Sequence, residues 1–114
     1  MNNFNRGEVW LADLNPGFRS KPGKIRPVLI IQNQAIISRG YYSTIVMPLT
    51  TQINPDKEKF RFSVKSRDRL IKDSDVMLDQ IAAIDSAMFG YGPLTKLTEK
   101  EMGEVLKKFV RLIS

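Results

Sequence analysis

The chain has 114 residues, a length that fits one domain over residues 1–114 and leaves no room for two. It contains no cysteine and no histidine, which excludes disulfides, thiolate metal sites and the most common general base. A formal net charge of +6 favours a polyanionic partner, nucleic acid first, with a generically basic protein as the alternative. Because neither a signal peptide nor a membrane-spanning apolar run is present, we expect a cytoplasmic protein without membrane contact.

The N-terminal third of the chain predicts two strands around a loop. Residues 8–14 are β-prone, and residues 27–32 form an apolar, β-branched run with Pro27 at its entrance, which is typical of a central strand. Between them, residues 19–26 are polar and basic and include a Pro-Gly pair, which predicts a loop.

The middle of the chain predicts more short strands. Residues 43–50 form one, in which Pro48 indicates a sheet edge or a bulge. Residues 60–64 alternate apolar and polar side chains, which favours a strand with one wet face. Residues 75–81 predict a buried strand that ends in polar residues, and residues 82–85 continue or bend it. Many short strands separated by turns indicate a small barrel or sandwich.

The C-terminus predicts a helix. Thr98 and Glu101 have the spacing of a capping box, in which each side chain binds a backbone N–H of the first turn. A stripe of apolar side chains follows at helical spacing, and we expect it to face the core rather than a partner. The stripe consists of Met102, Val105, Leu106, Phe109, Val110 and Ile113.

The predicted first loop carries four cations and no acid: Arg19, Lys21, Lys24 and Arg26. Such a loop suits a phosphate backbone, although a solvated surface loop is an equally good interpretation. Because Arg26 stands at the mouth of a buried strand, it suits a fixed charge directed at a phosphate under attack. An ordinary arginine at a strand end is the alternative.

Polar side chains also follow two later strands. Thr50, Thr51 and Gln52 close one of them and could bind phosphate or a base edge, although such residues more often form a turn. Asp79 and Gln80 close another, where a buried carboxylate needs a partner such as Arg26. A carboxylate next to an amide could also read a base.

The sequence gives little support for a metal or other cofactor. Asp73 and Asp75 lie close together, but the chain lacks the His and Cys ligands and the EF-hand glycine pattern that would indicate a metal site. Neither a phosphate-binding glycine loop nor a Ser-His-Asp triad is present. We expect no cofactor.

Four blocks of the chain, in order and followed by a helix, resemble the MazF/PemK/Kid toxins of type II toxin-antitoxin systems. The resemblance implies a mainly β fold, a small SH3-like twisted barrel with a C-terminal helix. It also implies a homodimer that binds single-stranded RNA, and a cognate antitoxin whose acidic segment occupies the same groove. The blocks are RGEVWLADLNP (residues 6–16), RPVLIIQN (26–33), MPLTTQ (47–52) and VMLDQI (76–81), with Ile-Asp at 84–85.

The resemblance also implies roles for individual residues. The family's catalytic arginine matches Arg26, and its catalytic threonine matches Thr50. Its acid-Gln pair, which contacts RNA, matches Asp79 and Gln80. In the first loop the family's Gly-Ser-Glu-Gln is replaced by residues 19–22, so that only the serine is kept and a lysine stands where the glutamate was. We expect RNA to be bound by Arg19, Ser20, Lys21, Lys24, Thr51, Gln52, Asp79 and Gln80.

The expected chemistry is attack by the substrate's own 2′-hydroxyl, which needs no metal and leaves a 2′,3′-cyclic phosphate and a 5′-hydroxyl. Arg26 would clamp the phosphate, and Thr50 would bind a non-bridging oxygen or orient Arg26. The residues leave the general base open. A CcdB-like poison of DNA gyrase and a nucleic-acid-binding barrel without catalysis are the alternative functions.

Overall fold

The computed structural model describes residues 2–14 and 25–114. The strands are β1 (Glu8–Asp13), β2 (Ile25–Ile30), β3 (Ser43–Thr50), β4 (Arg61–Val64), β5 (Ser74–Met77), β6 (Ala82–Asp85) and β7 (Phe89–Lys96). The helices are α1 (Gln34–Ser38) and α2 (Glu99–Ile113), with 3-10 segments at η2 (Pro55–Phe60), which is kinked at Lys57, η3 (Leu78–Gln80) and η4 (Ser86–Met88). Neither α1 nor α2 has the length and apolar character that crossing a membrane requires.

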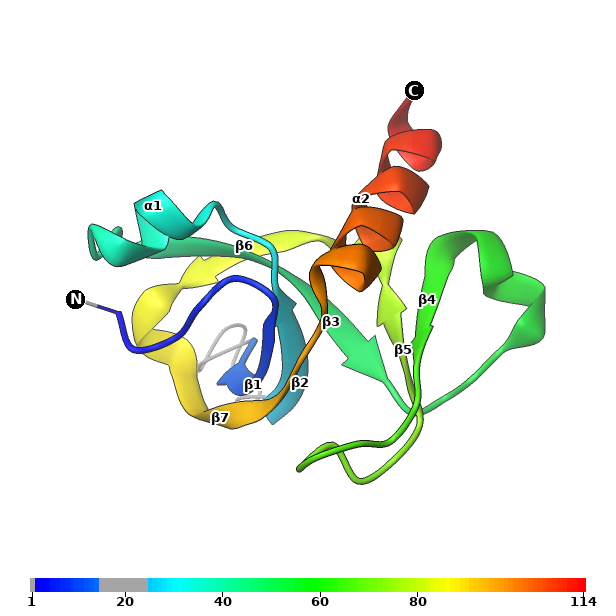
Figure 1. Ribbon diagram of the computed structural model, residues 1–114, viewed down its shortest axis with the longest axis horizontal. Coiled ribbons are helices and arrows are strands. Elements are labelled where there is room, and N and C mark those ends of the chain that lie inside the picture. The colour runs from blue at the N-terminus through cyan, green and yellow to red at the C-terminus, as the bar shows by residue number, and fades with distance from the viewer. Residues whose placement is uncertain (1, 15–24) are drawn as a thin grey trace, which may run out of the picture.

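Seven strands of the described residues form one antiparallel sheet in the order β4-β5-β3-β2-β1-β7, with β6 also paired to β3. Figure 1 shows that this sheet curls strongly, and that α2 follows β7 and rises away from the curl. Register shifts between β1 and β7 add local twist to the curl. The expected mainly β fold is confirmed as a curled half-barrel with a C-terminal helix.

Strand β3 changes its neighbours along its length. Residues 43–46 pair with β6, residues 46–48 with β2, and residues 49–50 with β5. The prediction that Pro48 marks an edge or a bulge is wrong, because Pro48 pairs in register with Val28 inside the sheet. On the other side of β3, Pro48 falls between the β6 and β5 pairings, where a missing N–H breaks no ladder.

Strand β2 is buried on both faces. Leu29 packs into one apolar cluster, which α2 covers, while Val28 and Ile30 pack into a second cluster beneath α1. A strand that packs between two clusters needs apolar side chains on both faces and therefore has a continuous apolar sequence. The predicted central strand is confirmed. It starts earlier than predicted, because Ile25 and Arg26 pair with β1 instead of belonging to the loop.

The other strand predictions vary in accuracy. Those at residues 8–14, 43–50 and 60–64 are confirmed as β1, β3 and β4 to within one residue at each end. Strand β7 and helix α1 lie in segments for which the sequence predicts neither a strand nor a helix. Strand β7 contains Gly90 and Gly92, residues that strands disfavour, and helix α1 has only five residues.

The prediction of one buried strand over residues 75–81 is wrong. Strand β5 ends at Met77, the chain then makes the 3-10 turn η3, and residues 82–85 form the separate strand β6 against β3. As a result Asp79 and Gln80 lie in a turn, where both are exposed, and the expectation that Asp79 needs a partner because it is buried is also wrong.

Helix α2 begins with the predicted capping box, in which both Thr98 and Glu101 bind backbone N–H groups. Met102 and Val105 are buried in the core, as expected for the apolar stripe. The expectation fails toward the C-terminus, where Val110 is 53% and Ile113 is 68% exposed. The reason is geometric, because the last turns of α2 extend beyond the sheet (Figure 1).

Glu101 also joins α2 to the loop after β4. Both of its carboxylate oxygens accept hydrogen bonds from Arg67 at 2.8 Å. Arg67 in turn donates to the Thr95 hydroxyl and the Lys96 carbonyl, both on β7. The hydrogen bonds from Arg67 lower the pKa of the Glu101 carboxyl from its ordinary 4.5 to about 2.

Replacing Glu101 is therefore expected to remove a pH-dependent part of the stability. Because its folded-state pKa is depressed, the contribution is complete above about pH 4.5 and is lost as the pH falls toward 2. We expect Glu101→Gln to lower the free energy of unfolding by about 1–2 kcal/mol at neutral pH, after allowance for partial exposure. The difference from wild type should shrink between pH 4.5 and 2. Urea unfolding at several pH values measures it.

Glu99→Gln is the matched control, since Glu99 is exposed in the same helical turn and its side chain makes no hydrogen bond in the described part of the chain. A Glu101→Gln variant with the same pH dependence of stability as wild type would contradict the assignment.

A second stability prediction comes from the contact between Gly92 and Trp10. A Cβ atom on Gly92 would lie 2.5 Å from Trp10 Cδ2, and Trp10 packs edge-on against Phe4 and Phe89. We expect Gly92→Ala to destabilise the protein by about 1–3 kcal/mol, because the indole must shift in a packed cluster. Thermal unfolding measures the loss.

Gly103→Ala provides the control for this substitution. A Cβ on Gly103 meets nothing within 4 Å, and the residue is exposed in the middle of α2. Alanine at this position should stabilise the helix by about 1 kcal/mol. Equal effects of the two substitutions would show that the Trp10 contact is unimportant.

Candidate active site

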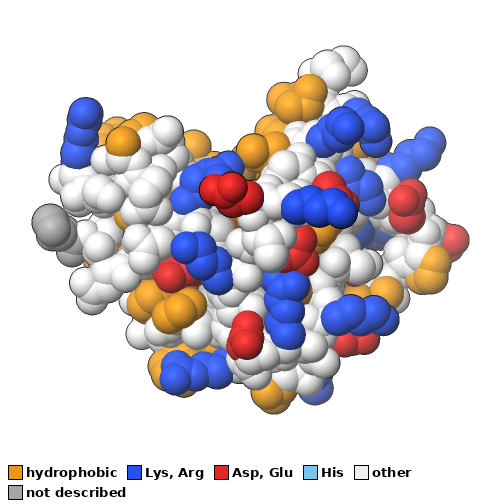
Figure 2. Space-filling model, in the orientation of Figure 1, with side chains coloured by type: hydrophobic (Ala, Val, Ile, Leu, Met, Phe, Trp, Pro, Cys, Tyr) orange, Lys and Arg blue, Asp and Glu red, His pale blue; other side chains and the backbone are white. Residues whose placement is uncertain are grey.

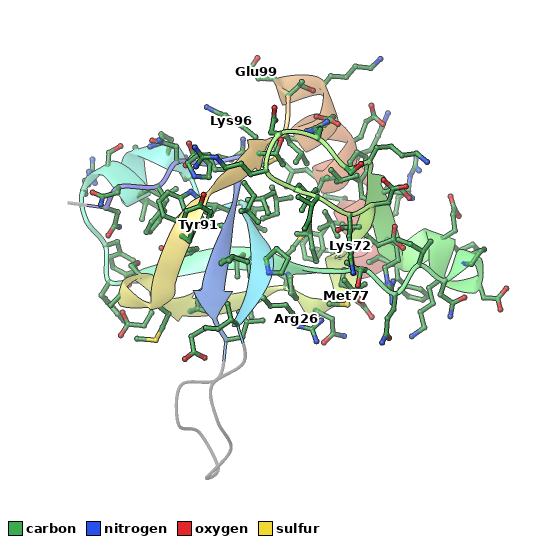
Figure 3. All side chains as sticks on the ribbon, turned by 90° about the horizontal axis from the view of Figure 1, so that it is seen from below. Arg26, Lys72, Met77, Tyr91, Lys96 and Glu99 are labelled. Atoms are coloured by element: carbon green, nitrogen blue, oxygen red, sulfur yellow. The ribbon has the colours of Figure 1, made fainter. Side chains whose placement is uncertain are left out.

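A cavity of 310 Å³ lies at the end of the sheet where β2 begins. Its walls come from segments far apart in the sequence, namely the end of β1, the starts of β2 and β4, the middle of β3, η2, and the junction of β5 with η3. Figure 3 shows two of its residues, Arg26 and Met77, near each other at the lower edge of the sheet. The lining residues are Leu14, Arg26, Pro48, Lys57, Arg61, Met77, Asp79 and Gln80.

The pairing of β3 explains why these segments meet. Strand β2 lies on one side of β3, while β5 and β6 share the other side. The turn η3 connects β5 to β6, so it has to pass the gap at residues 47–48 that separates their pairings. Asp79 and Gln80 therefore reach the same cavity as Arg26, although 52 intervening residues separate Arg26 from Asp79 in the sequence.

The backbone of Arg26 is fixed by strand pairing, while its guanidinium remains unpaired among the described residues. It pairs with Ala12 in the ladder between β1 and β2, and its side chain is partly buried. In residues 2–14 and 25–114, no hydrogen bond or ion pair engages its guanidinium or the Asp79 carboxylate. The predicted pairing of Asp79 with Arg26 is thus not formed, although both line the cavity.

The predicted polar residues at the end of β3 lie next to the cavity rather than in its wall. In the β2–β3 register Val28 is opposite Pro48, so two further residues on each strand would bring Arg26 opposite Thr50 on the same face. The Thr50 hydroxyl oxygen accepts a hydrogen bond from the Gln52 N–H at 3.1 Å, which closes a tight turn. Thr51 and Gln52 are exposed.

A buried ion pair beside the cavity is absent from the sequence-based predictions. Arg61 Nη1 lies 3.3 Å from Asp75 Oδ2 and also donates to the Gln52 carbonyl at 3.2 Å. Asp75 is only 3% exposed, and its other oxygen accepts a hydrogen bond from the Ser63 hydroxyl. A carboxylate at the first position of a predicted buried strand was the available signal, since such a group needs a cation.

Asp75 is therefore unavailable as half of a metal site with Asp73, which instead accepts a hydrogen bond from the Ser66 N–H. Among residues 2–14 and 25–114, no three His, Cys, Asp or Glu side chains are close enough together to hold a metal ion.

The cavity carries an excess of positive charge. Three cations, Arg26, Lys57 and Arg61, and one carboxylate, Asp79, line it. Even with Arg61 neutralised by Asp75, one positive charge remains to attract an anion. The predicted RNA-binding residues Arg19, Ser20, Lys21 and Lys24 lie outside the described residues.

Comparisons with known proteins identify relatives of this chain. The chain is 40% identical over 102 residues to the Endoribonuclease MazF of Staphylococcus saprophyticus, which covers 88% of this chain and 82% of the relative. Its structure resembles the Mycobacterium tuberculosis toxin MazF-mt6, with a TM-score of 0.76, 19% identity, and coverage of 93% and 95% of the two chains.

A mycobacterial endoribonuclease solved in complex with its cognate antitoxin has a TM-score of 0.73 and 21% identity, over 96% of this chain and 94% of that one. The family described as "PemK-like, MazF-like toxin of type II toxin-antitoxin system" matches residues 5–113. The chain belongs to this family of toxins.

Proposed function

We propose that this chain is a sequence-specific endoribonuclease that cleaves single-stranded RNA without a metal ion, using the substrate's own 2′-hydroxyl as the nucleophile. The observation that carries the proposal is the cavity that gathers Arg26, Asp79 and Gln80 under an excess of positive charge. Membership in a toxin family, with a 40% identical relative named Endoribonuclease MazF, supports the same activity.

Arg26 is the proposed electrostatic catalyst. Its guanidinium binds the non-bridging oxygens of the scissile phosphate and stabilises the negative charge that grows as the 2′-oxygen attacks phosphorus. A new P–O2′ bond forms while the P–O5′ bond breaks. The 2′-hydroxyl loses its proton to a base and the 5′-oxygen gains one, which leaves a 2′,3′-cyclic phosphate and a 5′-hydroxyl. The rigid β1–β2 ladder keeps the charge in position before the substrate arrives.

Thr50 is proposed to assist Arg26. Its hydroxyl oxygen already accepts the Gln52 N–H, so the hydroxyl proton remains available to donate to a non-bridging phosphate oxygen. The β2–β3 register supports this role, because its extension by two residues on each strand beyond the Val28–Pro48 pair would bring Thr50 opposite Arg26.

Asp79 and Gln80 are proposed to read the RNA sequence. Both are exposed at the cavity, and together they offer a carboxylate acceptor and an amide that both donates and accepts. Such groups can bind the edge of an unstacked base, which a single strand presents and an A-form duplex hides. Thr51 and Gln52, at the exposed end of β3, are proposed to bind adjacent nucleotides.

The proposal extends to partners and location. We propose a cognate antitoxin with an acidic segment, supported by the mycobacterial endoribonuclease that is solved with its antitoxin. A homodimer is supported by the exposed apolar residues Val110 and Ile113 on α2, which a second protomer could cover. The cytoplasm is the proposed location, since it contains the RNA substrate.

Arg26→Ala tests the proposed catalyst. We expect kcat to fall by about 10²–10³, the usual cost of removing one preorganised donor, while the melting temperature and RNA affinity change little. Cleavage of a long single-stranded RNA in EDTA, with mapping of the fragment ends, measures the loss and identifies the cyclic phosphate.

Arg39→Ala is the matched control, because Arg39 is an exposed arginine at the C-terminal end of α1 and lines no wall of this cavity. Unchanged cleavage by the Arg26→Ala variant would refute the assignment. Dependence of wild-type cleavage on a divalent metal would refute the metal-free mechanism.

A further inference from the structure

The proposed cleavage needs a proton donor for the leaving 5′-oxygen. When the P–O5′ bond breaks, its electron pair stays on the 5′-oxygen, and an alkoxide is a poor leaving group at neutral pH unless a positioned acid protonates it. The donor has to line the cavity that contains Arg26, and it has to carry a proton that it can release.

Of the described residues that line the cavity, only Lys57 meets both conditions. Three of the other lining residues are apolar, and two are arginines, whose guanidinium keeps its proton in proteins. The remaining two are Asp79, whose carboxylate only accepts hydrogen bonds, and Gln80, whose amide does not give up a proton. An ammonium group, in contrast, is charged at neutral pH and can transfer its proton.

The charge of Lys57 is not used elsewhere in the structure. Among residues 2–14 and 25–114, neither a hydrogen bond nor an ion pair engages its ammonium group. Asp56 and Glu58 flank it in the sequence, but neither lines the cavity, and Glu58 lies 3.6 Å from Lys108 Nζ. Figure 2 shows acidic side chains at the right-hand end of the visible face, where η2 lies in Figure 1. The ammonium is therefore available to a substrate.

The backbone around Lys57 is anchored on both sides. The Asn54 side-chain oxygen accepts the Asp56 N–H at 3.0 Å, and the Asn54 carbonyl accepts the Lys57 N–H at 3.0 Å. On the other side, Lys108 Nζ donates to the Glu58 carbonyl at 3.0 Å. Between these anchors η2 kinks at Lys57, which has a φ of −104° and a ψ of 20°. The anchors hold the side chain at the cavity wall, and its flexible stem lets the ammonium approach a bound RNA.

Lys57 and Arg26 reach the cavity from opposite sides of β3. Arg26 lies on β2, which pairs with one side of β3, whereas η2 leads into β4, which lies beyond β5 on the other side. A phosphate between the two cations can therefore contact both. Because Arg26 is proposed to bind the non-bridging oxygens, a bridging oxygen is left for Lys57.

We propose that Lys57 is the general acid of the cleavage reaction. Its ammonium group gives a proton to the 5′-oxygen as the P–O5′ bond breaks, and the neutral amine then takes a proton from solvent water. The attack of the 2′-oxygen is unchanged. This inference rests on the proposed endoribonuclease function and deepens it, because it assigns the proton that the leaving group gains.

Lys57→Ala tests the assignment with two RNAs that share one mapped cut site. The first has the ordinary 5′-oxygen at the cut, and the second has sulfur in its place, which leaves as a thiolate without needing a proton. For the ordinary RNA we expect kcat to fall by about 10²–10⁴-fold, the usual contribution of a general acid. For the sulfur-containing RNA we expect the variant and wild type to cleave at the same rate.

Two further variants separate proton donation from charge. Lys57→Arg keeps the positive charge and should retain the wild-type KM, but its kcat on the ordinary RNA should stay low, because a guanidinium does not release its proton. Lys59→Ala is the matched control, since Lys59 is an exposed lysine of η2 that does not line the cavity, and it should cleave both RNAs like wild type. Thermal unfolding establishes that each variant is folded.

The outcomes distinguish this inference from the proposed function. If wild type cuts RNA and Lys57→Ala cuts it equally fast, only the role of Lys57 is wrong. Equal losses on the two RNAs, or restoration of kcat by Lys57→Arg, would show that Lys57 contributes charge alone and would overturn the general acid. If wild type cuts neither RNA, the endoribonuclease proposal fails, and the role of Lys57 fails with it.

Discussion

Strand β3 runs through the middle of the sheet, and its change of partners determines where the polar side chains lie. Because β5 and β6 pair with different parts of the same side of β3, the turn between them passes Pro48. The start of β2 lies on the opposite side, with Arg26 two residues beyond Val28, where the β2–β3 pairing ends. A single strand thus brings a cation, a hydroxyl and a turn with a carboxylate to one end of the sheet.

The buried pair of Arg61 and Asp75 has a different role from the unpaired Arg26. A carboxylate that is 3% exposed is costly without a cation, so Asp75 requires Arg61, and the Ser63 hydroxyl satisfies its other oxygen. In return the pair fixes a guanidinium whose remaining donors face solvent-filled space. A cation that is fixed before its ligand arrives loses little conformational entropy on binding.

How far the sequence predicts this structure depends on whether the determining contact is local. The capping box of α2 and the β2 run are local patterns, and both are confirmed. The end of β5 at Met77 follows from competition between β5 and β6 for the same side of β3, which no local pattern records. The Arg61–Asp75 pair joins two strands whose pairing the sequence does not specify, so the sequence-based predictions do not include it.

The chain's lack of histidine and cysteine is consistent with a site built from charge and position. If the RNA supplies its own nucleophile, the protein has to hold the phosphate, align the 2′-oxygen and stabilise the developing charge. Arginine suits that task because it stays protonated and binds phosphate with two parallel donors. The same requirement explains why the cations stand on or beside strands, since a guanidinium on a paired strand is positioned more precisely than one on a loop. Activity in such a site depends directly on the pairing of β3, because Arg26, Asp79 and Gln80 each lie on a strand or turn that contacts it.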